Sequence, residues 1–171
     1  MELFLEKIKK YGEHKNNRLV LFGDQFEFDL SKSFPLINTN FSYILDKILE
    51  FKIEYPSNLE SVFMLQNFSL NPTTETFQLY VKNNSVLEGK ISIKICDAYN
   101  RLPLRIGIYS LLLYLISHML NYKVGRIICS MGETYLLLKD LDKELNVNKL
   151  NLAIVKKCEI FEDFTLDCFR Y

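Results

Sequence analysis

Side chains that could bind an anion gather around the start of a long apolar stretch. Lys94, Asp97, Arg101 and Arg105 lie close together in the sequence. In one interpretation Lys94 and Arg105 bind a phosphate and Asp97 orients Arg105. In the other, these charges form a solvated helix N-terminus with one surface ion pair, which stabilises a protein little. Charged residues are common at the ends of helices and strands, so the second interpretation is favoured on residue type alone.

The thiols and imidazoles offer less chemistry. The chain has four cysteines, Cys96, Cys129, Cys158 and Cys168. None forms a C-x-x-C pair and there are only two histidines, so we expect no zinc site and no cofactor. The neighbouring carboxylate of Asp97 would raise the pKa of Cys96, which favours an ordinary thiol over a nucleophile. His118, inside the apolar stretch, is expected to be a hydrogen-bonded core histidine.

The apolar stretch itself predicts a buried central helix, roughly Leu104–Asn121. Nearly every residue between Ile106 and Leu120 is apolar, which leaves no face for water. A membrane-spanning helix needs about 20 apolar residues, and this run is shorter and interrupted. A strand, Arg126–Met131, is predicted to follow it.

Composition is that of one globular domain, residues 1–171, in a reduced cytoplasmic setting. Apolar residues make up 49% of the chain and charged residues 25%. Lys plus Arg equals Asp plus Glu, 21 each, which argues against broad binding of nucleic acid or of a membrane surface. The N-terminal residues lack the apolar core of a signal peptide.

Patterning along the rest of the chain predicts an α+β fold with mostly antiparallel strands. The expected helices are an amphipathic one at 2–14, one from Asn40 or Ser42 to about Phe51, and one at Glu133–Asn146. The expected strands are Arg18–Leu30 with a possible bulge at Gly23, Val62–Gln66, the hairpin Thr76–Lys82 and Lys90–Cys96, and the short Leu152–Val155 and Phe161–Leu166. Residues 31–40 are expected to be a loop, because Pro35 lies in a Ser/Thr/Asn-rich segment.

Six segments, in order along the chain, resemble thymidylate synthases. They are FGDQFEFDLSKSFPLINT, YILDKILEF, QLYV, LPLRIGIYSLLLYLISHML, GRIICSMGETYLLLKDLD and FEDFTLD. The resemblance implies that family's layered α+β fold, with a mixed or antiparallel sheet around a buried central helix. It also implies a homodimer formed back to back through the sheets, to which Phe22, Phe26 and Phe28 could contribute.

The resemblance also indicates that the family's chemistry is lost. Thr73 aligns with the nucleophilic cysteine, and an isolated hydroxyl ionises far too weakly to replace a thiol. Lys47 aligns with the catalytic glutamate and reverses its charge. Arg105 aligns with the asparagine that reads the pyrimidine, and Tyr135 with the histidine that holds the sugar.

Two binding positions are less altered. Lys94 aligns with a phosphate-binding arginine, and Asp97 retains the aspartate of the same motif. The phosphate loop, by contrast, shrinks to Arg18, the segment before the nucleophile position is shortened, and the closing C-terminal tail is expected to be missing after Tyr171. Because these groups act as a unit, their joint absence argues against methyl transfer.

The sequence therefore leaves three hypotheses, and it leans away from an enzyme. The first is non-catalytic binding of a nucleotide or other small phosphorylated ligand, for which the candidate residues are Lys94, Asp97, Arg105, Gln78, Thr73 and Tyr135. The second is a protein–protein interaction module on a dimeric scaffold. The third is a divergent transferase that modifies pyrimidine nucleotides. Fold alone does not choose among them.

Overall fold

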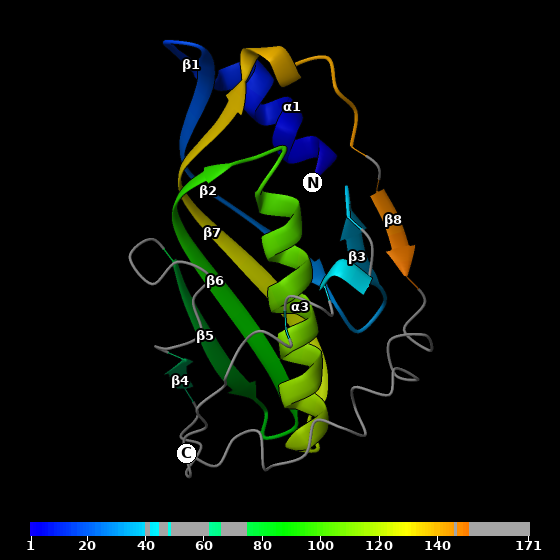
Figure 1. The fold of residues 1–171 in the computed structure, drawn as a ribbon. Helices are drawn as coiled ribbons and strands as arrows, with labels where there is room; N and C mark the ends of the chain where they lie inside the picture. Colours follow the sequence, from blue (N-terminus) through cyan, green and yellow to red (C-terminus); the bar gives the residue numbers. More distant parts are fainter. Residues whose placement is uncertain (40–41, 45–47, 49–61, 66–74, 146, 151–171) are drawn as a thin grey trace.

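A computed structural model describes residues 1–39, 42–44, 48, 62–65, 75–145 and 147–150 (Figure 1). The elements are α1 (Glu2–Tyr11), β1 (Glu13–Lys15), β2 (Arg18–Asp29), β3 (Phe34–Ile37), β4 (Val62–Leu65), β5 (Glu75–Lys82), β6 (Val86–Asp97), α3 (Leu102–Met119), β7 (Lys123–Leu137), the 3-10 helix η1 (Leu138–Asp140) and β8 (Val147–Leu150). The fold is α+β, as predicted.

The central helix α3 is the core of the molecule. Pro103 suits the first turn of the helix, because proline has no backbone N–H and the first N–H groups of a helix have no partner within it. Apolar side chains then cover every face of the helix. It contacts β6 and β7 on one side and β3 on another, and the Tyr114 hydroxyl donates to the Leu30 carbonyl. By length and composition the helix could span a membrane, but 78% of it is buried inside the structure. The predicted buried helix is confirmed.

One expectation about this helix needs correction. His118 is exposed, not part of the core, because it lies in the last turn of α3. Ser117, one residue earlier, is still buried and donates its hydroxyl to the Leu113 carbonyl at 2.6 Å.

A mixed six-stranded sheet, in the order β1-β2-β7-β6-β5-β4, covers one side of α3 (Figure 1). All neighbouring pairs are antiparallel except β6 and β7, which are parallel. β6 and β7 can run parallel because α3 forms the crossover between them, whereas strands joined by a short hairpin run antiparallel. In the hairpin between β5 and β6, Asn83 and Asn84 adopt positive φ angles of 51° and 54°, which asparagine tolerates. The predicted hairpin is thus confirmed.

Two other predictions are wrong. Residues 34–37, expected in a loop, form β3, whose four side chains are all buried and which pairs with β8. Within the part of the chain that the structure describes, this sheet has two strands, so Pro35 lies in an edge strand, where proline is tolerated.

Residues 133–137, expected in a helix, extend β7 instead. All five pair with β2 and residues 133–135 also pair with β6, so sheet pairing overrides their local preference. Residues 42–44 and 48 are helical and β4 matches its predicted strand, but most of the second predicted helix lies outside the described residues. The strands expected at 152–155 and 161–166 also lie outside them.

The inward and outward alternation of side chains reverses at one level of the sheet, in three adjacent strands. In β6 the inward positions pass from Ile93 to Cys96, and in β7 they pass from Met131 to Thr134. Gly23 of β2, where the sequence suggested a bulge, lies at the same level and has a φ of 76°. Each strand therefore places two successive residues on the face away from α3, which we call the open face.

Gly132 lies in β7 at the point where the inward and outward alternation of side chains reverses. A Cβ there would lie 2.5 Å from the Lys94 carbonyl oxygen, so the close approach of β6 requires glycine. On the open face just beyond this level, Phe22 and Ile95 lie on either side of Glu133 and are 81% and 50% exposed.

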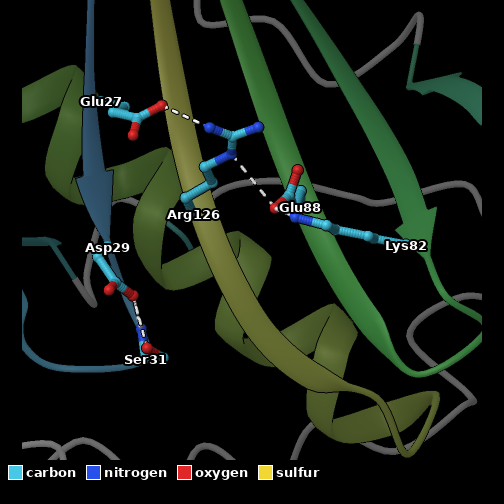
Figure 2. A network of polar contacts seen from close by, with 6 residues as sticks. All are labelled: Glu27, Asp29, Ser31, Lys82, Glu88 and Arg126. Carbon is cyan, nitrogen blue, oxygen red and sulfur yellow. Dashed lines mark hydrogen bonds and ion pairs between the residues drawn. The ribbon is translucent and has the colours of Figure 1, made fainter.

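The open face is otherwise largely polar. Figure 2 shows Arg126 between two carboxylates, 2.8 Å from Glu27 and 3.2 Å from Glu88, with Lys82 3.4 Å from Glu88. Phe26 and Phe28 point the other way and pack against the core; the Phe26 ring lies 4.7 Å from that of Phe4. Of the three phenylalanines expected on an apolar sheet surface, only Phe22 faces outward.

Candidate functional site

Four side chains from three elements converge below the start of α3, and we call them the Arg105 cluster: Glu75, Cys96, Arg105 and Tyr109. Arg105 Nη2 lies 2.8 Å from Glu75 Oε1, and the Tyr109 hydroxyl donates to Glu75 Oε2 at 2.9 Å. Arg105 Nη1 donates to the Cys96 sulfur at 3.3 Å. Glu75 begins β5, Cys96 lies near the end of β6, and α3 carries the other two, so the fold itself assembles the cluster.

The ion pair at its centre is removed from water. The Arg105 and Glu75 side chains are 11% and 0% exposed. Burial raises the pKa of Glu75, and the positive charge of Arg105 and the hydrogen bond from Tyr109 oppose that rise. Each carboxylate oxygen therefore has a donor or a positive charge beside it, as a buried carboxylate requires.

The thiols of this region are not activated. Burial raises the pKa of Cys96 to about 11, although the nearby Arg105 acts in the opposite direction. Burial also raises the pKa of Cys129 to about 12. Because the thiolate is the reactive form, both side chains are poor nucleophiles at neutral pH. The expectation that Cys96 is an ordinary thiol agrees with this geometry.

Asp97 has a different set of partners. Its carboxylate accepts from the backbone amides of Tyr99 and Asn100 at 3.0 and 2.8 Å, and from the Asn100 side chain at 2.9 Å. Asn100 also donates to Asp140 at 3.1 Å. These bonds shape the turn that leads into α3. The charge that orients Arg105 comes from Glu75, where the sequence analysis expected Asp97.

The sheet separates the remaining candidate residues from Arg105. Lys94 lies on the open face, because it directly follows the inward-facing Ile93 and precedes the reversal. Gln78 lies on the same face, since the inward positions of β5 are Glu75 and every second residue after it. The structure thus brings Arg105 together with neither Lys94 nor Gln78.

Tyr135 also lies on the far side of the sheet from Arg105, among polar neighbours. The Arg18 guanidinium lies 4.7 Å from the centre of its ring and 3.3 Å from a carboxylate oxygen of Glu133. Thr73, the remaining candidate, lies outside the described residues.

Glu75 is the residue that sequence reasoning missed. Its signal was present: it shares the inward face of β5 with Phe77, Leu79 and Val81, all buried. A carboxylate at an inward position of an apolar strand predicts a buried partner of opposite charge.

Other features of the described residues lie elsewhere. A cavity of about 550 Å³ opens between α1 and the segment after η1, lined by Leu5, Glu6, Lys9, Leu141, Asp142, Lys143, Glu144 and Leu145. None of these residues belongs to the Arg105 cluster. Among the described residues, no group of three or more His, Cys, Asp or Glu side chains could hold a metal ion.

Comparison with known proteins finds similarity to thymidylate synthases. The chain is 32% identical to a thymidylate synthase from Mycoplasma mobile over 108 residues, which cover 58% of this chain and 36% of that protein. It is 28% identical to one from Francisella tularensis subsp. holarctica, over 61% of this chain and 40% of the relative. The chain thus spans well under half of these two relatives. No family model matches the chain.

A third relative is matched over more of its length. A thymidylate synthase from Buchnera aphidicola subsp. Acyrthosiphon pisum is 24% identical over 202 aligned positions, covering 77% of this chain and 76% of the relative. The alignment is longer than the 171 residues of the chain, so it contains gaps in this chain.

Replacing Arg105 with methionine should destabilise the protein, by about 3–5 kcal/mol near neutral pH, because it leaves Glu75 buried without a positive partner. Arg105 opposes the rise that burial causes in the pKa of Glu75, so without Arg105 the folded state favours the neutral carboxyl and the loss should shrink as the pH falls. Urea unfolding between pH 5 and pH 8 measures this. The double variant Arg105→Met, Glu75→Gln should recover much of the loss and show a flatter pH dependence. Equal destabilisation of the single variant at both pH values would contradict the assignment.

Proposed function

We propose that this chain, a distant homologue of thymidylate synthases over much of its length, is a non-catalytic protein that binds a nucleotide or other small phosphorylated ligand at Arg105. The observation that carries the proposal is the Arg105 cluster. A carboxylate already lies against the guanidinium of Arg105 and the hydroxyl of Tyr109, 2.8 and 2.9 Å from their donor atoms. This corner therefore has the donors that an oxyanion needs.

A phosphate group needs the same kind of hydrogen-bond donors as that carboxylate. Both present oxygens that accept charge-assisted hydrogen bonds, and the planar guanidinium fits either one. The buried position of Arg105 strengthens such contacts, because little water competes for them. The homology supports a nucleotide as the phosphorylated ligand, since thymidylate synthases are named for a nucleotide product.

We propose that the chain is not catalytic because the side chains that catalysis would need are either not activated or of the wrong type. Cys96 is the thiol nearest to Arg105 among the described residues, and its pKa of about 11 keeps it protonated at neutral pH. Thr73 stands at the position that aligns with the nucleophile, and Lys47 at that of an acidic group; both lie outside the described residues. A divergent transferase would need a nucleophile and a base within reach of each other, and the Arg105 cluster supplies a paired carboxylate and an unactivated thiol.

A protein-interaction role on a homodimer is the second candidate function, and the open face favours it. Phe22 and Ile95 are exposed there, on either side of Glu133. Exposed large apolar side chains that lie close together are typical of interfaces. The polar network around Arg126 would then lie within or beside the contact between the two subunits.

Purified protein should make no thymidine monophosphate from deoxyuridine monophosphate and methylenetetrahydrofolate. The physical reason is that Cys96 is not ionised and that a threonine hydroxyl does not form the required adduct. Product formation is followed by absorbance and chromatography, with an active thymidylate synthase as the positive control. Turnover that survives further purification would overturn the non-catalytic assignment.

Arg105→Ala should weaken binding of deoxyuridine monophosphate about ten- to a hundredfold, because a hydrogen bond to a charged group contributes about 1.5–3 kcal/mol. Thermal-shift titration against nucleoside mono-, di- and triphosphates identifies the best ligand, and calorimetry then gives its affinity. Lys94→Ala is the matched control, since Lys94 lies across the sheet from Arg105 and its loss should leave affinity unchanged. Equal affinity of the Arg105→Ala variant and the unmodified protein would refute binding at this site.

Light scattering at micromolar concentration should report about twice the chain mass of 20.2 kDa if the open face joins two copies. Phe22→Asp with Ile95→Asp should then give a monomer, because a charge in place of each exposed apolar side chain opposes its burial. Leu3→Asp is the control, since Leu3 is equally exposed (87%) but lies on α1. A monomer of the unmodified protein would remove this candidate function.

A further inference from the structure

We propose that the Glu75 carboxylate is an internal occupant of the oxyanion site on Arg105, so that a phosphorylated ligand binds by displacing Glu75, which takes up a proton as it leaves. The inference rests on the proposed function and deepens it. It makes Glu75 the residue that sets which anions bind and at which pH, a role that the alignment with thymidylate synthases does not suggest. The displacement involves no change in covalent bonds other than O–H formation on Glu75.

Competition follows from the limited number of donors. One terminal nitrogen of Arg105 lies on Glu75 and the other donates to Cys96. The Arg105 side chain is only 11% exposed, so it has little surface left for a second anion. A phosphate that engages Arg105 must therefore take the place of the carboxylate or share Arg105 with it at close range, where two negative charges repel each other.

Proton uptake follows from the groups that would surround the Glu75 carboxylate after its displacement from Arg105. Among the described residues, α3 presents Arg105 and Tyr109 to it and β6 presents Cys96. With Arg105 held by the ligand, none of these supplies an unshared positive charge. The Glu75 side chain is fully buried, and a buried carboxyl without a positive partner is stable only in its neutral form. The proton comes from solvent, so one proton enters with each bound ligand.

The sign of the pH dependence is then fixed. In this proposal the 2.8 Å pairing with Arg105 keeps Glu75 ionised in the free protein, and Glu75 is neutral in the complex, so binding consumes a proton and is favoured at low pH. Over the range in which both conditions hold, affinity should fall about tenfold for each unit by which the pH rises. A simple arginine site for a phosphate dianion would show no such slope above the pH at which the phosphate itself is fully ionised.

Calorimetric titration with deoxyuridine monophosphate tests this between pH 7 and 8.5, where the phosphate remains largely the dianion. Repeating it in buffers of different ionisation enthalpy measures the protons taken up, and we expect about one per ligand. Inorganic sulfate, which carries a fixed charge throughout, serves as a second probe by competition. Glu75→Gln should bind at least about tenfold more tightly at pH 8 and take up no proton, because no carboxylate competes.

Glu75→Gln leaves Arg105 unpaired and could unfold the protein, so Tyr109→Phe is the second variant. It removes one donor to the Glu75 carboxylate while keeping the ring that packs against Phe77. The weakened carboxylate should be displaced more readily, which moves the pH profile to higher pH. Tyr114→Phe is the matched control: it removes another buried hydroxyl of α3, bonded to Leu30, and should leave the profile in place.

The outcomes separate this inference from the proposed function. Binding that depends on Arg105 but shows neither pH slope nor proton uptake, with Glu75→Gln no tighter, leaves the function standing and overturns the displacement. Tight binding by Glu75→Gln alone supports Glu75 as the occupant and removes ligand binding from the unmodified protein. No binding by the unmodified protein, Glu75→Gln or Tyr109→Phe overturns both.

Discussion

A helix with no polar face is the constraint on which the rest of the fold depends. Every side of α3 has to be covered, and the six-stranded sheet and β3 each contact part of it. Because α3 also links β6 to β7, it makes these two central strands parallel within an otherwise antiparallel sheet. Its first turn then lies beside the end of β6 and the beginning of β5. The position of Arg105 is thus a result of packing, and the charge it brings into the core needs a partner.

Glu75, the partner of Arg105, determines which chemistry the Arg105 cluster can perform. Glu75 neutralises Arg105, and together they occupy the space next to Cys96. The cost of separating two buried charges makes the arrangement specific, whereas a surface pair in the same geometry would be dispensable. A site organised in this way favours exchange of one oxyanion for another over bond-making.

The parts of the fold that sequence predicted correctly are those with a local signal. The apolar run of α3, the alternation in β5 and that in β6 as far as Ile93 are patterns within one segment. The strand character of residues 133–137 depends on pairing with both β2 and β6, and that of β3 depends on β8, neither of which a local window contains. At the site, Arg105 followed from its place in α3. Lys94 was grouped with Arg105 because the two are close in the sequence and in the family alignment, although the alternation that turns Ile93 inward turns Lys94 to the open face. Glu75 was overlooked, although its inward position could be inferred from the alternation in β5.

The reversal shared by β2, β6 and β7 also limits how this chain can change in length. Gly23, Lys94 and Gly132 lie side by side at one level, and the close approach at Gly132 holds them there. Deleting one residue from a single strand would shift its pairing with both neighbours by one residue beyond this level, so that its inward side chains would lie opposite outward ones. A change in the length of one of these strands is therefore compatible with the sheet only when the other two change with it.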